Sequence, residues 1–230
     1  MVMAQDRRWW QWIDASYIRE LIFQSNDGIM AVAGMALGLI GADVSTLTAV
    51  AVVAISTAAG ALSIFGTRMG EAFAEREAEL ATVEEEERLL KLSPEEEVEE
   101  LADWFEEKGV SQETSLAVAE ELSAADALGA QLELEYGLKG VTSVGQAWTI
   151  SILSAVAFLL GAAVPLLISY LVPWSWRDDY TVLATVLALT LTSIALALFG
   201  RSRFWPTVLR TLTIGLTTLA ITYFLGDWLM

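Results

Sequence analysis

The chain of 230 residues contains no cysteine and no histidine, and it has only four prolines. Without cysteine there is neither a disulfide framework nor a thiolate metal site. Without histidine there is no Ser–His–Asp or Cys–His machinery, and no other nucleophile–base pair stands out. We therefore expect a protein that is not an enzyme and uses no organic cofactor. Any bound metal must be held by oxygen atoms, with methionine sulfur as the only soft ligand.

Basic residues are also scarce, since 13 Lys and Arg face 30 Asp and Glu and the formal net charge is −17. Such a chain cannot neutralise a phosphate backbone, so we expect no nucleic-acid partner. Yet 55% of the residues are hydrophobic and the mean hydropathy is +0.51. Residues 71–140 hold 22 of the acidic and five of the basic residues, and the rest of the chain holds eight of each sign. The sequence therefore predicts two parts that face different solvents.

The parts that flank the acidic segment have the composition of membrane helices. Four long apolar stretches cover residues 46–66, 147–172, 181–200 and 207–226. Each exceeds the roughly 18–20 residues that a helix needs to cross about 30 Å of hydrocarbon. With a further span before Asp43, we predict an all-α integral membrane protein with five transmembrane helices. Two lie in residues 21–70 and three in residues 141–230, with an acidic helical domain of residues 71–140 between spans 2 and 3.

The distribution of Lys and Arg predicts the orientation of these spans. With a cytoplasmic N-terminus, twelve of the 13 basic residues lie on the cytoplasmic side and Arg177 alone lies outside. We therefore expect residues 71–140 in the cytoplasm, the C-terminus outside, and a multi-pass protein of a prokaryotic cell membrane. Residues 1–20 combine tryptophans with arginines, which is typical of an amphipathic helix in the headgroup plane.

Carboxylates lie on or beside apolar helix faces in the acidic segment. At 100° per residue these are Glu79, Glu86, Glu87, Glu97, Glu100 and Glu135. Periodicity alone places Glu87, rather than Glu86, inside the apolar stripe of its helix. Burying such groups unpaired is costly, and only five basic residues are at hand, so divalent cations are the natural counter-charge. The alternative interpretation is a solvated acidic surface.

A carboxylate is also expected at membrane depth in the first span. Only 15 residues separate Asp27 from Asp43, which as a helix cover about 22 Å, too little to cross the hydrocarbon. The helix must therefore begin near Leu21, which places Asp27 inside the membrane, where an ionisable group indicates a functional site. Met30 follows one turn later and could share an ion with it. The alternative is that residues 25–27 cap a short, tilted helix at a thinned interface.

Four motifs stand in an order that resembles the vacuolar iron transporter family. They are S-N-D-G at residues 25–28, A-G-A-L-S at 59–63, S-P-E-E-E-V-E-E-L at 93–101 with E-K-G at 107–109, and E-Y-G-L at 135–138. The resemblance covers about residues 20–226. It implies five membrane helices with a cytoplasmic Glu-rich domain between the second and third. It also implies a homodimer that exports Fe²⁺ and similar divalent ions from the cytosol in exchange for protons.

The resemblance also assigns individual residues. The family's membrane aspartate falls on Asp27, and its metal-domain acids fall on Glu86, Glu97, Glu100 and Glu135. The chain departs from the family's pattern in the metal domain, where a glutamate falls on Leu89 and a methionine pair falls on Gln131 and Leu132. It also departs from the pattern in the second span, where a glutamate falls on Ser56 and a following methionine falls on Ile64. The membrane site has thus lost one charge and one soft ligand.

From these observations we predict a transporter that moves a divalent metal out of the cytosol, with Asp27, Met30 and Ser56 along its pathway. Asp27 would hold either a proton or a metal ion. Because donors are nearly all oxygen, Mn²⁺ or Fe²⁺ is expected rather than copper or zinc. The expected partners are membrane lipid, protons and a second copy of the chain, which GxxxG motifs at 34–38 and 66–70 favour. One alternative is a membrane-anchored metal buffer or sensor. Another is a structural protein whose acidic helices dock a basic partner.

Overall fold

The computed structural model describes residues 15–200 and 203–229, and all regular structure in that part of the chain is helical. The elements are α1 (Ala15–Gly41), α2 (Thr46–Leu92), α3 (Pro94–Glu107), α4 (Gln112–Leu134), α5 (Val144–Leu171), the 3-10 turn η1 (Trp174–Trp176), α6 (Arg177–Gly200) and α7 (Phe204–Leu229). Of the amphipathic helix expected for residues 1–20, the first 14 residues lie outside the described part. Residues 15–20 are the first turns of α1.

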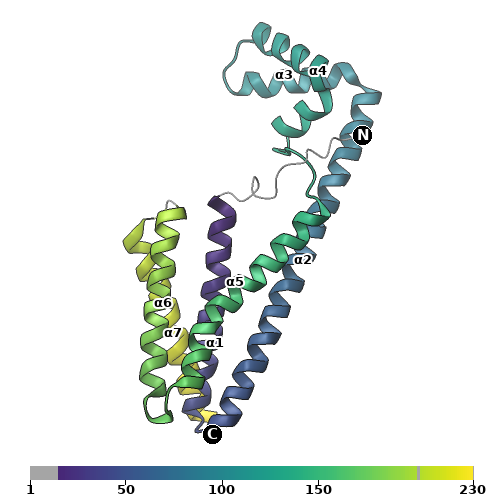
Figure 1. The fold of residues 1–230 in the computed structure, drawn as a ribbon. Coiled ribbons are helices and arrows are strands. Elements are labelled where there is room, and N and C mark those ends of the chain that lie inside the picture. Colours follow the sequence, from purple (N-terminus) through teal and green to yellow (C-terminus); the bar gives the residue numbers. More distant parts are fainter. Residues whose placement is uncertain (1–14, 201–202, 230) are drawn as a thin grey trace. The chain divides into compact units, whose positions relative to one another are not determined.

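The described residues form two compact units (Figure 1). The acidic unit comprises Gly70–Ala147, and the apolar unit comprises residues 15–69 and 148–229. Helix α2 contributes to both, because no proline or turn signal interrupts it between Thr46 and Leu92. The second apolar stretch and the start of the acidic segment therefore belong to one helix.

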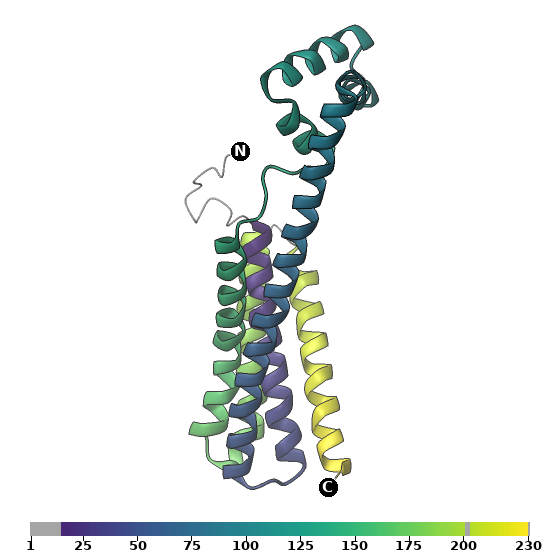
Figure 2. The same cartoon turned by 90° about the vertical axis from the view of Figure 1, so that its right-hand side faces the viewer.

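Four helices among the described residues are long and apolar enough to cross a membrane, namely α2, α5, α6 and α7. In Figure 2 the helices of the apolar unit run alongside one another. Helix α1 is not among the four, because its first half carries Glu20, Gln24, Asn26 and Asp27. The fifth span therefore remains a prediction.

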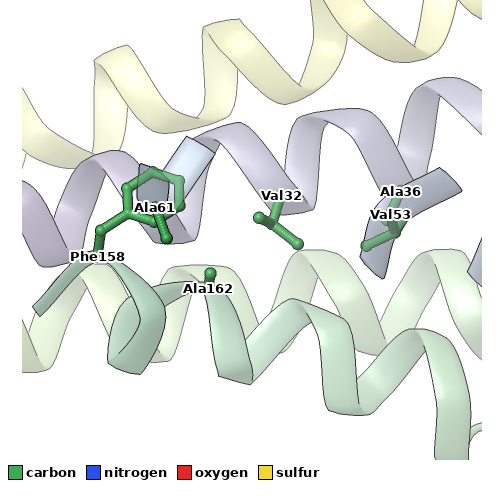
Figure 3. Packing of buried hydrophobic residues seen from close by; sticks show 6 residues of the cluster. All are labelled: Val32, Ala36, Val53, Ala61, Phe158 and Ala162. Carbon is green, nitrogen blue, oxygen red and sulfur yellow. The ribbon is translucent and has the colours of Figure 1, made fainter. Parts of the chain in front are cut away.

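Neighbouring helices cover most of the surface of α1. It packs against α6 and α7, and a buried cluster joins it to α2 and α5. That cluster brings together Val32 and Ala36 of α1, Val53 and Ala61 of α2, and Phe158 and Ala162 of α5 (Figure 3). The helix can therefore carry polar side chains, because the apolar side chains of the other helices provide the surface toward lipid.

Glycines set the separation between α1 and α5. A Cβ atom at Gly28 would collide with the backbone oxygen of Phe158, and one at Gly161 would collide with the backbone oxygen of Ser25. The two backbones are therefore in direct contact, as small residues permit in membrane helix pairs.

The GxxxG motif at Gly34 and Gly38 is also used within the chain. Both glycines face Thr222 of α7, and a Cβ atom at Gly226 of α7 would collide with the backbone oxygen of Gly38. By contrast, Cβ atoms at Gly66 and Gly70 would meet nothing within 4 Å. Of the two motifs, only the second remains open on the described surface.

The acidic unit is built around the α3–α4 hairpin, whose core is Leu101, Ala102 and Ala119. Pro94 occupies the first turn of α3 after Ser93, and the Ser93 side chain makes no capping hydrogen bond. Gly109 ends α3 with a positive φ of 92°. Helix α4 is interrupted at Asp126, where the backbone leaves the helical region.

A further helical segment begins after Asp126. The Asp126 Oδ1 accepts a hydrogen bond from the backbone N–H of Gly129 at 3.0 Å, which caps the following turns. Residues 127–134 therefore act as a separate short helix, and Gly137 ends it with a φ of 67°. This short helix carries the last acidic residues of the unit.

The contact between α1 and α5 predicts a large effect of one methyl group. We expect Gly161→Ala to lower the free energy of unfolding by about 1–3 kcal/mol, since overpacking against a backbone cannot be relieved by a side-chain movement. Thermal unfolding in detergent measures the change. Gly145→Ala in the first turn of the same helix is the matched control, because its Cβ atom has open space. Equal melting temperatures for the two variants would contradict the close contact.

Candidate functional site

Acidic side chains from three helices share one region of the acidic unit. Glu86 comes from α2, Glu97 and Glu100 from α3, and Glu135 follows the last turn of α4. Glu86 is 1% exposed and Glu97 is 4% exposed, whereas Glu100 and Glu135 lie at the surface. We call these four residues the acid cluster.

The register of α2 explains why Glu86 belongs to the cluster. The residues of α2 that face this unit follow a 3.5-residue spacing and are Ala72, Arg76, Glu79, Val83, Glu86 and Leu90. Glu87 lies outside this seam, is half-buried, and pairs with Lys91 at 3.6 Å. The preference for Glu87 that apolar periodicity gave is therefore not what the structure shows, because the seam itself contains charged residues.

Like charges dominate the electrostatics of the cluster. Burial raises the pKa of Glu86 to about 7, and a hydrogen bond to Glu97 and the negative charges of Glu97, Glu135 and Glu100 act in the same direction. The pKa of Glu100 is also raised, first by burial and then by Glu97 and Glu135. No basic residue contributes to either shift. Among residues 15–200 and 203–229, no basic side chain therefore supplies the cluster with a counter-charge.

One amide group holds the buried part of the cluster in place. Gln131 of α4 is 2% exposed, and its Nε2 donates to the backbone oxygen of Glu97 at 2.6 Å and to Glu97 Oε2 at 3.2 Å. Glu86 Oε1 is buried and has no hydrogen-bond partner among the described residues. A buried carboxylate oxygen without a donor is costly, and a cation is the ligand that would satisfy it.

Tyr136 lies beside the exposed edge of the cluster. Desolvation of its hydroxyl, together with a hydrogen bond to Glu135 and the charges of Glu135, Glu86 and Glu97, raises the pKa of Tyr136 to about 12. The phenol is therefore neutral and supplies one hydrogen bond to the Glu135 carboxylate.

Glu79, another predicted ligand, has a different role. Its carboxylate accepts hydrogen bonds from the backbone N–H of Thr142 at 2.6 Å and from the Thr142 hydroxyl at 3.1 Å. Arg76, one turn earlier on α2, donates to the backbone oxygen of the same threonine at 2.6 Å. The two side chains thus fix the segment that leads into α5, and Glu79 does not contribute to the field at Glu86.

The acid cluster does not converge on one point in this structure. Among the residues described, no three carboxylates are close enough together to hold a metal ion. The cluster is nevertheless chemically suited to one, because it offers carboxylate oxygens, an unpartnered buried acceptor and no competing cation. Binding would require small shifts of the exposed Glu100 and Glu135 side chains.

The apolar unit holds the second candidate site. Asp27 is the thirteenth of the 27 residues of α1, yet its side chain is exposed on the surface of the single chain. The neighbouring Asn26 is 4% exposed, and its Oδ1 accepts a hydrogen bond from the Thr192 hydroxyl of α6. Asn26 therefore joins α1 to α6, whereas the Asp27 side chain is exposed.

The structure does not bring the three predicted pathway residues together as expected. The Met30 sulfur is directed toward Gly215 of α7, where it would lie 3.9 Å from an added Cβ atom. Asp27 faces the surface, and Ser56 is half-buried in the middle of the apolar part of α2. A shared ion between Asp27 and Met30 would need a different methionine rotamer.

The raised pKa of Glu86 predicts how pH changes the stability of the metal-free protein. Its pKa rises from an ordinary 4.5 to about 7, so the folded state keeps a proton that the unfolded chain has lost. The resulting stabilisation is complete below about pH 4.5 and is lost as the pH rises through about 7. We therefore expect Glu86→Gln to raise the melting temperature at about pH 8, but not at about pH 4.5, in thermal unfolding with a chelator present.

The matched control is Glu84→Gln, because Glu84 is exposed on the same helix. The melting temperature of Glu84→Gln should differ between the two pH values by the same amount as that of the wild type. If Glu86→Gln melts at the wild-type temperature at the higher pH, then burial does not hold a proton on Glu86.

Comparison with known proteins matches nearly the whole chain to one family. The chain is 28% identical over 214 residues to a vacuolar iron transporter of Acanthamoeba castellanii (strain ATCC 30010 / Neff), an alignment that covers 92% of this chain and 78% of that protein. The model of the VIT family matches residues 18–227. The protein is an all-helical, multi-pass integral membrane protein, and it belongs to the VIT family.

Proposed function

We propose that this protein exports a divalent metal ion such as Fe²⁺ or Mn²⁺ from the cytosol in exchange for protons. The observation that carries the proposal is the burial of Glu86 and Glu97 together, without a basic residue, beside Glu100 and Glu135. Membership of the VIT family and the similarity to a protein named a vacuolar iron transporter support metal transport as the purpose of that arrangement.

The acid cluster is the capture site in this proposal. Burial and the neighbouring carboxylates raise the pKa of Glu86 and of Glu100, so these two groups would gain from a cation that replaces their protons. A high local negative potential also raises the concentration of divalent ions at this surface. The side chains near Glu86 that could act as metal ligands are carboxylates and the amide of Gln131. They offer oxygen ligands, because the chain has no cysteine or histidine. This donor set favours Mn²⁺ and Fe²⁺ over copper.

Asp27 is the relay in the membrane. With α1 as the fifth span, its position in the middle of the helix places the carboxylate far from both aqueous phases. A carboxylate there holds either a proton or a metal ion, and alternation between the two is the minimal device for antiport. Met30 and Ser56 are the further pathway residues, with Met30 as a soft second ligand once its side chain turns.

A homodimer explains why Asp27 is open on the single chain. A mid-membrane carboxylate is too costly to leave against lipid, so a second copy is the natural cover. Helix α2 offers a matching face, since its apolar half is largely exposed and the GxxxG motif at residues 66–70 meets nothing within the chain. The metal would then pass between the two copies.

The orientation follows from the basic residues. Arg177 is the only Lys or Arg between the third and fourth apolar spans, and the other twelve fall on the opposite side of a five-span protein. The positive-inside rule then places residues 71–140 and the N-terminus in the cytoplasm, with the C-terminus outside. Metal captured by the acid cluster would leave the cytosol. We propose a prokaryotic cell membrane as the location.

A membrane-anchored buffer or sensor is the alternative function. It is favoured by one observation: four of the acids that the resemblance places in the metal domain are present, whereas the second span contributes no carboxylate at Ser56. A buffer would bind metal at the acid cluster and move none.

Asp27→Asn decides between transport and buffering. In proteoliposomes loaded with a metal-sensitive dye, we expect the wild type to carry Mn²⁺ and Fe²⁺ faster with an opposing proton gradient. The variant should carry neither, because an amide cannot exchange a proton for a metal, while Mn²⁺ binding at the acid cluster persists.

Asp43→Asn is the matched control, since Asp43 lies between α1 and α2 with a φ of 49°, which asparagine tolerates. It should transport as the wild type does. A wild type that binds Mn²⁺ but shows no flux with either gradient would favour the buffer.

Metal binding at the acid cluster should depend on pH. Because Glu86 loses its proton only near pH 7, the affinity of the full chain for Mn²⁺ should rise between about pH 6 and about pH 8. Isothermal titration in detergent measures this rise, and Glu86→Gln should weaken binding and flatten the dependence. Glu84→Gln should retain both, and an unchanged pH dependence in Glu86→Gln would exclude Glu86 as a ligand.

A further inference from the structure

An ion pair joins α1 to α2 at a place that the proposed pathway does not yet use. Arg68 is the first charged residue after the apolar stretch of α2, and its Nη2 pairs with Glu20 Oε1 of α1. The side chains are partly buried, at 24% exposure for Arg68 and 36% for Glu20. Tyr17, one turn earlier on α1, also lies within the field of the guanidinium.

Gln24 completes the surroundings of the Glu20 carboxylate. It is 5% exposed, and its Nε2 donates to Glu20 Oε1 at 2.8 Å. This bond fixes the amide orientation, because the reverse orientation would set two oxygens against each other. Gln24 Oε1 is buried and has no hydrogen-bond partner among the residues that the structure describes.

The unpartnered oxygen calls for a physical reason. Buried amide oxygens are nearly always hydrogen-bonded, and those that are not often mark a missing ion or water. Here Nε2 of the same amide group contacts the Glu20 carboxylate, so a cation shared by the carboxylate and the amide oxygen would take the place of that hydrogen bond. Hard cations such as Mn²⁺ and Fe²⁺ take carboxylate and amide oxygens as ligands, whereas the Arg68 guanidinium pairs with the carboxylate and leaves the Gln24 oxygen without a hydrogen bond.

We propose that Glu20 and Gln24 form a second divalent-cation site, whose resting occupant is the tethered Arg68 guanidinium. A metal ion takes the site by displacing Arg68 from Glu20. This inference rests on the proposed function, since it supplies a step between metal capture and Asp27.

The spacing along α1 places the site on the way to Asp27. Glu20, Gln24 and Asp27 stand at positions i, i+4 and i+7, so they follow one face of the helix. Asp27 lies two turns, or about 10 Å, beyond Glu20. An ion released from Glu20 therefore reaches Asp27 along side-chain oxygens of a single helix.

Arg68 makes the site selective by charge. A monovalent ion offers Glu20 no more charge than the guanidinium already does, and it competes with a cation held at high effective concentration by its own chain. A divalent ion doubles the charge and also uses Gln24 Oε1. Arg68 would thus reject Na⁺ and K⁺ and set a threshold concentration for the metal.

Metal counting on the full chain in lipid nanodiscs tests the site without relying on transport. At a fixed low free Mn²⁺ concentration, we expect Arg68→Gln to bind about one more Mn²⁺ per chain than the wild type, by electron paramagnetic resonance. Arg68→Lys, which keeps the charge, should match the wild type. In Arg68→Gln combined with Glu20→Gln the extra ion should be absent. Equal counts in Arg68→Gln and the wild type, or an extra ion that survives Glu20→Gln, would overturn the proposal.

Flux measurements then place the site on the pathway. In proteoliposomes, Arg68→Gln should lower the half-saturating Mn²⁺ concentration by about two- to fivefold, the factor that a partly exposed ion pair accounts for. Glu20→Gln should raise it, and Arg68→Ala serves as a second removal of the charge. An unchanged half-saturation in both Arg68 variants would overturn the proposal while transport stands. Absence of flux in the wild type would overturn transport, and the Mn²⁺ count would still decide whether the site exists.

Discussion

The covering of α1 by its neighbours is the constraint on which the apolar unit depends. A helix that carries Asn26 and Asp27 in its middle cannot stand alone in lipid, because polar groups there need partners. Backbone contact with α5, glycine contacts with α7 and the bond from Thr192 to Asn26 satisfy this need on three sides. One strip remains open, and it is the strip that holds Asp27. The residue proposed as the membrane relay therefore lies where the neighbouring helices leave α1 uncovered.

The acid cluster follows the opposite logic, because its groups are buried without being satisfied. Glu86 and Glu97 lie in the interior of the acidic unit, and Gln131 donates to Glu97 from another helix. The amide fixes the Glu97 carboxylate but leaves Glu86 Oε1 open. Folding therefore maintains a surplus of negative charge that protons offset at low pH and that a divalent ion would offset at neutral pH.

Much of this arrangement could be predicted from the sequence. Long apolar runs indicated α2, α5, α6 and α7. The burial of Glu86 was harder to predict. Periodicity follows apolar residues alone, whereas the seam of α2 also contains charged residues, so it favoured Glu87. The roles of Glu79 and Gln131, and the pairing of Glu20 with Arg68, depend on partners 34 to 63 residues away, which no local pattern encodes.

The glycine contacts of α1 have a mechanical consequence. Because Gly28 and Gly161 set backbone against backbone, and Gly38 and Gly226 do the same on the other side, neither α5 nor α7 can slide along α1 without a clash. These three helices must travel as one body through any cycle of alternating access. Shear is left to contacts made by side chains alone, such as those of α2 and α6, whose rotamers can exchange as the helices shift.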